Sequence, residues 1–312
     1  MLELVSTRHN PMVDPGLHVW GWQIPVYLFL GGWVAGIMVL SGYLLFKGRH
    51  ARRSCICFAM PLVALVLLSL GMLALFLDLE HKLYTWRLYV AFEPWSPMSW
   101  GAWILLLVYP VLIAMALVRP PAIALLIIPG LEVVSRRLAG SRPLLRALGG
   151  ASMAGGVALG IYTGILLSAL GARPLWTSSI LGPLFLASGL SSGAAFAHMV
   201  ARDREESEAL ARADNGFLWG ELALIALFLI GLSSGGEAQA GAAGLLMGGP
   251  YTAAFWVVVV GLGIVAPLLI QSLALGHRIG HTPIAPALVL LGGLGLRFVI
   301  VYAGQYSHWP RV

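Results

Sequence analysis

Charged side chains are scarce in this sequence. Asp, Glu, Lys and Arg make up 10% of its 312 residues, whereas hydrophobic residues make up 59% and the mean hydropathy is +0.88. A soluble protein of this size carries about 25% charged residues. The composition therefore excludes a soluble globular protein and predicts an all-α polytopic membrane protein.

Cysteine is almost absent, and so are the familiar cofactor-binding motifs. Cys55 and Cys57 are the two cysteines, whereas an iron–sulfur cluster takes four protein ligands. The sequence has no Walker, dinucleotide-binding or zinc-site spacing. We interpret both cysteines as small apolar residues at a helix end and expect no iron–sulfur cluster in this chain.

Histidine is missing from the middle of every long apolar segment. A membrane cytochrome b needs paired histidines at matching depth on facing helices, and the eight histidines here flank the apolar segments instead. The sequence therefore argues against haem and leaves only a pair at the membrane surface as an alternative. The histidines are His9, His18, His50, His81, His198, His277, His281 and His308.

Eight apolar runs have the length of about 20 residues that a transmembrane helix needs. A further apolar segment, 120–134, is short, contains prolines and Glu132, and is expected at the membrane surface or as a helix extension. The charged stretch 201–215 is predicted to be a linker or a short amphipathic turn. The expected spans are 22–46, 56–77, 99–118, 148–171, 179–200, 216–235, 252–275 and 283–304.

The loops on the two sides differ in basic residues. Of the 19 Lys and Arg residues, thirteen lie in one set of loops, five lie in the other set and at the chain ends, and Arg297 lies within a span. Because basic loops stay in the cytoplasm, both termini and the loop at 78–98 are predicted to lie outside. This topology accounts for the net charge of +6, so we infer no nucleic-acid partner. Residues 1–16 are polar and the first span is too long for a signal-peptide core, so we expect no cleaved signal.

Small residues recur in several spans and predict close helix packing. The first and fifth spans also resemble each other, with PVYLFLGGWVAG in one and PLFLASGLSSGAA in the other. Both would cross the membrane in the same direction. This similarity suggests two four-helix bundles related by a parallel repeat, with residues 1–171 in the first and 172–312 in the second.

Ionisable and aromatic side chains are concentrated at 78–103, between the second and third spans. Ionisable groups at the end of a membrane helix often mark a proton or ligand site. A hydrated loop with an aromatic belt has the same composition, so both interpretations stay open. The ionisable side chains are Asp78, Glu80, His81, Lys82, Arg87 and Glu93.

Polar residues from three spans are expected at similar depth near the outer surface. Gln23 and Tyr27 are four residues apart and share a helix face, Asp78 ends the second span, and Tyr162 lies in the outer half of the fourth. Hydrogen-bond donors, apolar walls and an exit to lipid suit a quinone, whose two carbonyls accept hydrogen bonds. The same tyrosines would also suit an aromatic belt.

Quinone chemistry moves two protons in each turnover, so an acid or base open to water is required nearby. Asp78, Glu80 and His81 fit this role. We therefore predict these three residues as the acid–base groups, and Gln23 and Tyr27, together with the tyrosine of the fourth span, as binding residues.

The later spans contain Glu221, Arg297, Tyr302 and Gln305. A buried Arg and a buried Glu can neutralise each other, which is a structural role. They can also belong to a proton route with Glu221 at its inner end. The sequence leaves both interpretations open.

Three classes of function are compatible with these features: a redox subunit, a transporter or proton channel, and a purely structural anchor. Transport would be favoured by helices broken at mid-depth by Gly or Pro. Pro25, Pro183, Pro250 and Pro267 lie mainly near span ends, which favours a rigid anchor.

Seven motifs occur in the order of a known family over nearly the whole chain, and SPMSWGAW and RPLW are the more specific ones. On these motifs the chain resembles the polysulfide reductase membrane subunit family, also called the NrfD-like family. The motifs are YLFLGGWVAG (27–36), LDL (77–79), PWSPMSWGAWILLL (94–107), YTGILL (162–167), RPLW (173–176), FLASGLSSGAA (185–195) and RFVIVYAGQ (297–305).

The resemblance implies an eight-helix anchor of two four-helix bundles in a bacterial inner membrane, without a cofactor of its own. Such a subunit exchanges electrons between menaquinone or ubiquinone and a ferredoxin-like iron–sulfur subunit on the periplasmic side. Through that subunit it would serve a molybdopterin enzyme, a cytochrome or a hydrogenase. The resemblance also implies quinone ligands at Tyr162, Gln23 and Tyr27, and an acidic position at Asp78.

Overall fold

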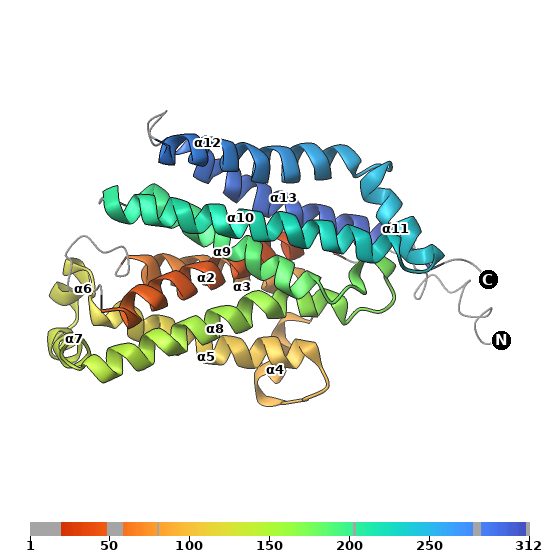
Figure 1. Ribbon diagram of the computed structural model, residues 1–312. Helices are drawn as coiled ribbons and strands as arrows, with labels where there is room; N and C mark the ends of the chain where they lie inside the picture. Colours follow the sequence, from red (N-terminus) through yellow and green to blue (C-terminus); the bar gives the residue numbers. More distant parts are fainter. Residues whose placement is uncertain (1–19, 49–58, 80, 202–203, 277–281, 310–312) are drawn as a thin grey trace.

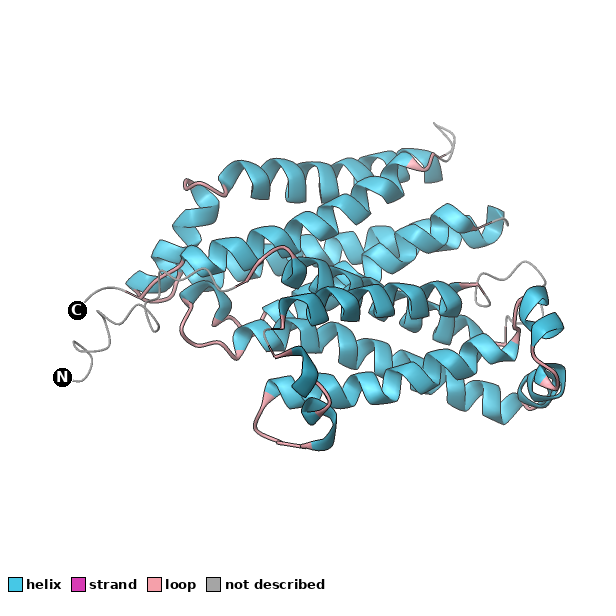
Figure 2. Cartoon of the chain, turned by 180° about the vertical axis from the view of Figure 1, so that it is seen from behind, coloured by secondary structure: helices cyan, strands magenta, loops and turns pink. Residues whose placement is uncertain are grey.

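In the described part of the chain, all regular secondary structure is helical (Figure 2). Eight helices are long and apolar enough to cross a membrane, which confirms the predicted all-α polytopic membrane protein. The computed structural model describes residues 20–48, 59–79, 81–201, 204–276 and 282–309. Cys55 and Cys57 lie outside these ranges.

The spanning helices run side by side along the length of the molecule (Figure 1). The seventh span combines a π-helical part, η6, with the α-helix that follows it. The spans are α2 (Gln23–Phe46), α3 (Met60–Asp78), α5 (Pro97–Val118), α8 (Arg142–Ser168), α9 (Leu181–Val200), α10 (Arg204–Ser233), η6 (Ala254–Val265) with α12 (Ala266–Leu275), and α13 (Ile284–Tyr306).

Short helices connect the spans. Figure 1 shows α6 and α7 at one end of the molecule and α11 at the opposite end. With six and ten residues, α6 and α7 are too short to span a bilayer, as predicted for 120–134. The short elements are η4 (Lys82–Tyr84), α4 (Arg87–Val90), α6 (Ala122–Ile127), α7 (Leu131–Gly140), η5 (Pro174–Trp176) and α11 (Glu237–Met247).

The sixth span begins earlier than the sequence predicted. Because α10 starts at Arg204, most of the charged stretch 201–215 is helix, and the predicted linker or turn is wrong. The stretch is rich in Ala, Glu, Leu and Arg, which are strong helix formers. Glu205 and Glu206 also lie in the first turn, where the helix dipole favours acidic side chains.

α2 lies at the centre of the molecule and packs against α3, α8, α9 and α13 (Figure 1). The glycines of α2 and α9 bring the two backbones into contact. A Cβ on Gly36 would overlap the carbonyl of Gly189, and a Cβ on Gly193 would overlap the backbone of Gly36. Because packing drives helix association in lipid, the predicted small-residue stripes act here as a helix interface.

The beginning of α2 and the end of α13 lie at the same end of the molecule. The backbone of Trp20 exchanges two hydrogen bonds with the Gln305 amide, 3.0 and 3.1 Å long. The Trp20 ring stacks on Trp176, whose Nε1 donates to the Ile300 carbonyl over 2.9 Å. The membrane side on which this end lies and the bundle boundary at 171–172 stay predictions.

Candidate functional site

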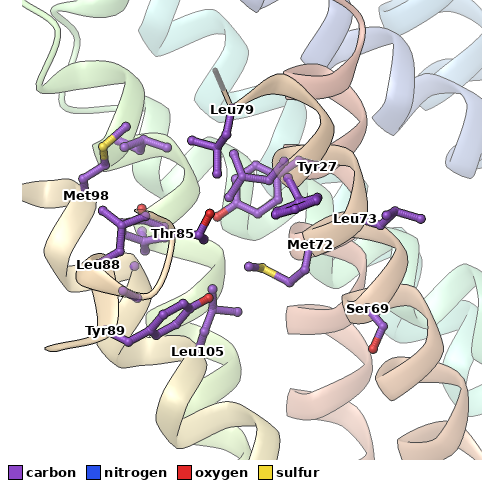
Figure 3. A pocket seen from close by; sticks show the side chains of 16 residues that line it. Tyr27, Ser69, Met72, Leu73, Leu79, Thr85, Leu88, Tyr89, Met98 and Leu105 are labelled. Atoms are coloured by element: carbon purple, nitrogen blue, oxygen red, sulfur yellow. The ribbon is translucent and has the colours of Figure 1, made fainter. Parts of the chain in front are cut away.

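A cavity of about 470 Å³ lies between α2, α3, α5 and α8 (Figure 3). The segment that contains η4 and α4 covers one side of it. The walls are apolar except for a few hydroxyl groups. The lining residues are Tyr27, Ser69, Met72, Leu73, Leu75, Phe76, Leu79, Thr85, Leu88, Tyr89, Met98, Gly101, Ala102, Leu105, Tyr162 and Leu166.

Lining side chains of α3 and of the beginning of α5 lie at the protein surface. Leu73, Phe76 and Met98 form the outer edge of the cavity and are 52, 41 and 57% exposed. These side chains belong to membrane-spanning helices, where exposed apolar groups face lipid. A hydrophobic molecule can therefore enter from the side of the protein.

Tyr27 and Tyr162 mark the inner wall of the cavity. Each ring is 4% exposed, and the two hydroxyl groups hydrogen-bond to each other. In this hydrogen bond one hydroxyl donates and the other accepts. The accepting hydroxyl keeps its own proton, which it can donate to a bound molecule. The predicted convergence of these two tyrosines from the first and fourth spans is therefore present.

Glycines make this convergence possible. A Cβ on Gly101 of α5 would overlap the hydroxyl and ring of Tyr162, so no other residue fits at this position without displacing the tyrosine. A Cβ on Gly71 of α3 would lie 3.3 Å from Leu30 and 3.9 Å from Tyr27. The small residues of α3 and α5 thus fix how closely these helices approach the tyrosine pair.

The covering segment is tied to the beginning of α5 by local hydrogen bonds. The Glu93 amide donates to the Ser99 hydroxyl over 3.0 Å, and Trp100 Nε1 donates to the Pro94 carbonyl over 2.7 Å. Within the segment, the Arg87 guanidinium lies 4.5 Å from the centre of the Tyr84 ring. These contacts hold α4 against the cavity.

Three further residues that carry hydroxyl groups line the cavity: Ser69, Thr85 and Tyr89. The Thr85 hydroxyl donates to the Lys82 carbonyl over 2.7 Å. Burial raises the pKa of the Tyr89 phenol, and the neighbouring Tyr109 raises it further. Tyr89 therefore stays protonated and can donate a hydrogen bond. Ser69 also shares a hydrogen bond of 3.3 Å with the Tyr109 hydroxyl.

The predicted binding residue Gln23 lies one turn before Tyr27 on α2 but is not part of the cavity lining. Its Oε1 is buried and has no hydrogen-bond partner among the described residues. The amide is therefore near the site without contacting the cavity.

Of the predicted acid–base residues, the structure describes Asp78 and His81. Asp78 is the last residue of α3 and is partly buried next to Leu79, which lines the cavity. His81 is exposed, with its ring 6.4 Å from that of Tyr84, and Glu80 lies outside the described residues. Across the described ranges, no three His, Cys, Asp or Glu side chains are grouped to hold a metal ion.

Two of the predicted intramembrane residues, Glu221 and Arg297, lie together and away from the cavity. Arg297 is 0% exposed, and its guanidinium donates to the Ser188 hydroxyl and to the Phe185 carbonyl. Glu221 hydrogen-bonds to the same serine and attracts Arg297 electrostatically. Both roles proposed for this pair, neutralisation and proton transfer, are compatible with these contacts.

Tyr302 and Gln305 lie nearer the end of α13 than Arg297. The Tyr302 ring stacks on Phe298 with 5.9 Å between ring centres. Gln305 is 3% exposed and uses its amide to bind the Trp20 backbone. The two Gln305 hydrogen bonds hold the beginning of α2 against the end of α13.

The sequence did not predict Ser69, Thr85 and Tyr89 as parts of the cavity, or Asp214 near Glu221. The aromatic-rich segment at 78–103 is a signal in the sequence for Thr85 and Tyr89. No comparable signal marks Ser69, because serine is common in membrane helices.

Comparison with known proteins gives a match along almost the entire chain. The sequence profile of the family described as "Polysulphide reductase, NrfD" matches residues 7–307. This chain belongs to that family. The predicted family is therefore confirmed.

Individual members of the NrfD family are similar over comparable lengths. Protein NrfD of Escherichia coli is 34% identical over 93% of this chain and 96% of its own length. One chain of the polysulfide reductase of Wolinella succinogenes is 30% identical over 92% of this chain and 94% of its own length. One subunit of the tetrathionate reductase of Salmonella typhimurium is 29% identical over 75% of this chain and 64% of its own length. The protein is thus a multi-pass membrane protein similar to membrane subunits of reductases.

Proposed function

We propose that this NrfD-family protein is the quinone-interacting membrane subunit of an oxidoreductase complex. The observation that carries the proposal is the cavity beside Tyr27 and Tyr162. Its volume of about 470 Å³ lies within the range of about 300–1,000 Å³ typical of small-molecule sites. Apolar walls, a few hydroxyl donors and an opening toward lipid match the chemistry of a quinone head group with an isoprenoid tail.

The hydroxyl groups around the cavity provide hydrogen bonds to the quinone oxygens. The free proton of the Tyr27–Tyr162 pair can be donated to one carbonyl, and the Tyr89 hydroxyl from the covering segment can donate to the other. Hydrogen bonds in such an apolar enclosure fix the orientation of the ring. Gln23 lies one turn before Tyr27 on α2 and is proposed as a further binding residue on this side of the site.

Oxidation of a quinol releases two electrons and two protons. In the proposed direction the protons pass to water through Asp78, which ends α3, and through Glu80 and His81, which follow it in the sequence. The electrons pass to a ferredoxin-like iron–sulfur subunit docked beside this end of the molecule. Quinone reduction would use the same groups in reverse.

The names of two relatives support the proposed partners. One relative is named as a chain of a polysulfide reductase and the other as a subunit of a tetrathionate reductase. We propose that the iron–sulfur subunit lies on the periplasmic side and links this protein to the subunit that holds the catalytic centre. That subunit would be a molybdopterin enzyme, a cytochrome or a hydrogenase. The predicted inner-membrane location, periplasmic termini and two four-helix bundles belong to this proposal.

The proposal can be tested in the complex purified through a tag on this chain, with a water-soluble quinol analogue as electron donor. Tyr162→Phe removes one neutral hydrogen bond, which contributes about 0.5–1.5 kcal/mol. It should raise the KM for the quinol about 2- to 13-fold, since about 1.4 kcal/mol is a factor of ten. Tyr43→Phe is the matched control, because Tyr43 is on the same helix as Tyr27 but is 49% exposed.

Electron delivery is measured as reduction of the iron–sulfur signal of the co-purified subunit, by electron paramagnetic resonance. The proposal would be wrong if quinol failed to reduce any cluster in the complex. It would also be wrong if Tyr162→Phe and Tyr43→Phe gave the same KM as the unchanged protein.

A further inference from the structure

A smaller cavity, of about 250 Å³, lies where α2 ends and α8 begins. This is the end of the molecule that carries α6 and α7 (Figure 1). Unlike the cavity beside Tyr27 and Tyr162, the smaller cavity has a mainly polar wall. Tyr27 lies near the opposite end of α2, about 27 Å away along the helix axis. The lining residues of the smaller cavity are Leu45, Phe46, Lys47, Gly48, Arg142, Leu145 and Arg146.

The contact between α2 and α8 sets the depth of this cavity. A Cβ on Gly149 would lie 2.6 Å from the Gly42 carbonyl oxygen and 2.9 Å from the Phe46 backbone nitrogen, so the two backbones touch. Beyond this contact, toward the end of the molecule, Lys47 and Arg146 take the place of the glycines. Their long side chains keep the helices from closing, and the cavity lies between them.

The floor of the cavity is apolar and lies against a packed core. Leu45 and Leu145 are 3 and 1% exposed and belong to one buried cluster with Met115 and Val118 of α5. Phe46 also lines the cavity and is 43% exposed. Because Phe46 belongs to a spanning helix, its exposed ring faces lipid. An occupant of the cavity therefore lies next to the hydrocarbon of the bilayer.

Three cationic side chains line the cavity, from Lys47, Arg142 and Arg146, and all three residues are exposed. Arg142 and Arg146 are four residues apart and share a face of α8. Among the described residues, no carboxylate lines the cavity, and none of the three cations has a hydrogen bond or an ion pair. The Lys47 ammonium lies 5.8 Å from the centre of the Tyr43 ring. The positive charges are therefore available to a ligand.

The local electrostatics favour an anion in this cavity. Arg142 is the first residue of α8, where the helix dipole is already positive, and the first turn contains no acidic residue. Glu132 of the neighbouring α7 is paired with Arg136. Like charges gathered around one cavity repel one another, so a bound anion would stabilise the arrangement.

The position of the cavity favours an anion that belongs to the membrane. Spanning helices end at the membrane surface, and basic pockets between such helices bind the head groups of anionic lipids. Arginine matches the geometry of a phosphate with two parallel hydrogen bonds. A free phosphate would leave the exposed Phe46 ring without a contact, whereas the acyl chains of a phospholipid would lie against it.

We propose that this cavity binds the phosphate group of an anionic phospholipid. Arg142 and Arg146 of α8 bind the phosphate from one side, and Lys47 of α2 binds it from the other. The acyl chains lie along Phe46. The lipid thus bridges α2 and α8, the two helices that carry the tyrosine pair of the larger cavity. This site does not depend on the function proposed for the larger cavity.

Native mass spectrometry of the full chain, purified in mild detergent, measures the binding of added lipids. Phosphatidylglycerol has a net negative charge, whereas phosphatidylcholine with the same acyl chains is neutral, because its choline group offsets the phosphate. The unchanged protein should bind phosphatidylglycerol more tightly than phosphatidylcholine. Equal affinities for the two lipids would overturn the proposal, and this result needs no variant to fold.

The double variant Arg142→Gln/Arg146→Gln removes two of the three cations. One basic residue beside an anionic lipid contributes about 5-fold in affinity, so the double variant should bind phosphatidylglycerol about 25-fold more weakly. Arg137→Gln/Arg212→Gln is the matched control, because it removes two exposed cations that do not line the cavity. The proposal is overturned if the cavity variant keeps its affinity, or if both double variants lose affinity equally.

The melting temperature distinguishes a lipid from a free phosphate, because a ligand of the folded state raises it. Phosphatidylglycerol should raise the melting temperature of the unchanged protein and of the control more than that of the cavity variant. Inorganic phosphate at the same concentration should raise it less, since it has no acyl chains to contact Phe46. An equal rise with inorganic phosphate would overturn the assignment of a lipid.

Discussion

The contact between Gly101 and Tyr162 allows a direct test of how the cavity is built. In Gly101→Ala, the new Cβ would overlap the Tyr162 hydroxyl and lie 2.6 Å from its ring carbon Cε1. Neither helix can retain its present position, because the neighbour is a rigid ring buried at 4% exposure. The change therefore displaces the tyrosine or separates α5 from α8.

The size of the effect follows from two contributions. Inserting a methyl group into a packed core costs about 1–3 kcal/mol of stability. Displacing Tyr162 also removes its hydrogen bond to a bound quinone, so the affinity for a quinone analogue should fall about 2- to 13-fold. Both are measured on the purified chain in nanodiscs, by thermal unfolding and by quenching of tryptophan fluorescence.

Gly150→Ala is the matched control, because a Cβ at this helical position of α8 meets no atom within 4 Å. It should leave quinone affinity unchanged and stabilise the helix by up to about 1 kcal/mol. Adding Tyr162→Ala to Gly101→Ala removes the overlap, so the two stability losses should not add. Additive losses, or a Gly101→Ala protein with unchanged stability and affinity, would refute the described packing.

Two other predictions concern the ends of the spanning helices. Gln305→Ala removes both hydrogen bonds to the Trp20 backbone and should destabilise the protein by about 1–3 kcal/mol, measured as a lower melting temperature; an unchanged melting temperature would contradict a structural role for Gln305. Burial raises the pKa of Tyr251 to about 12, and Tyr306 and Tyr302 nearby act in the same direction. Because the ordinary value of about 10 applies to the unfolded chain, stability should decrease as the pH rises from about 10 to 12, and Tyr251→Phe should reduce this loss in melting curves recorded against pH.

The spans were predictable because hydrophobic length is a strong signal in a chain with so few charges. The prediction was wrong for the beginning of α10. The charged residues of 201–215 suggested a linker, whereas the strong helix formers in the same stretch form a helix from Arg204 onward. The same error hid Asp214, which lies in the stretch that was assigned to the linker. Its burial depends on Ser191 and Gln271, which come from two other helices.

The cavity was predictable only in part. Tyr27 and Tyr162 could be placed because depth along a spanning helix follows from residue number. Thr85 and Tyr89 could not, because the segment that brings them to the cavity folds back through hydrogen bonds to Ser99 and from Trp100. Such contacts depend on the loop path and leave no periodic pattern.

The proposed function rests on a quinone head group beside Tyr162. A photoactivatable quinone analogue, reacted with the full chain in nanodiscs and located by mass spectrometry of the peptides, tests this most directly. We predict labelling of peptides that contain the cavity-lining residues of α3, α4 and α5, with loss of labelling when unmodified quinone competes. Labelling confined to other parts of the chain, or labelling of these peptides that competing quinone does not reduce, would contradict the proposed function.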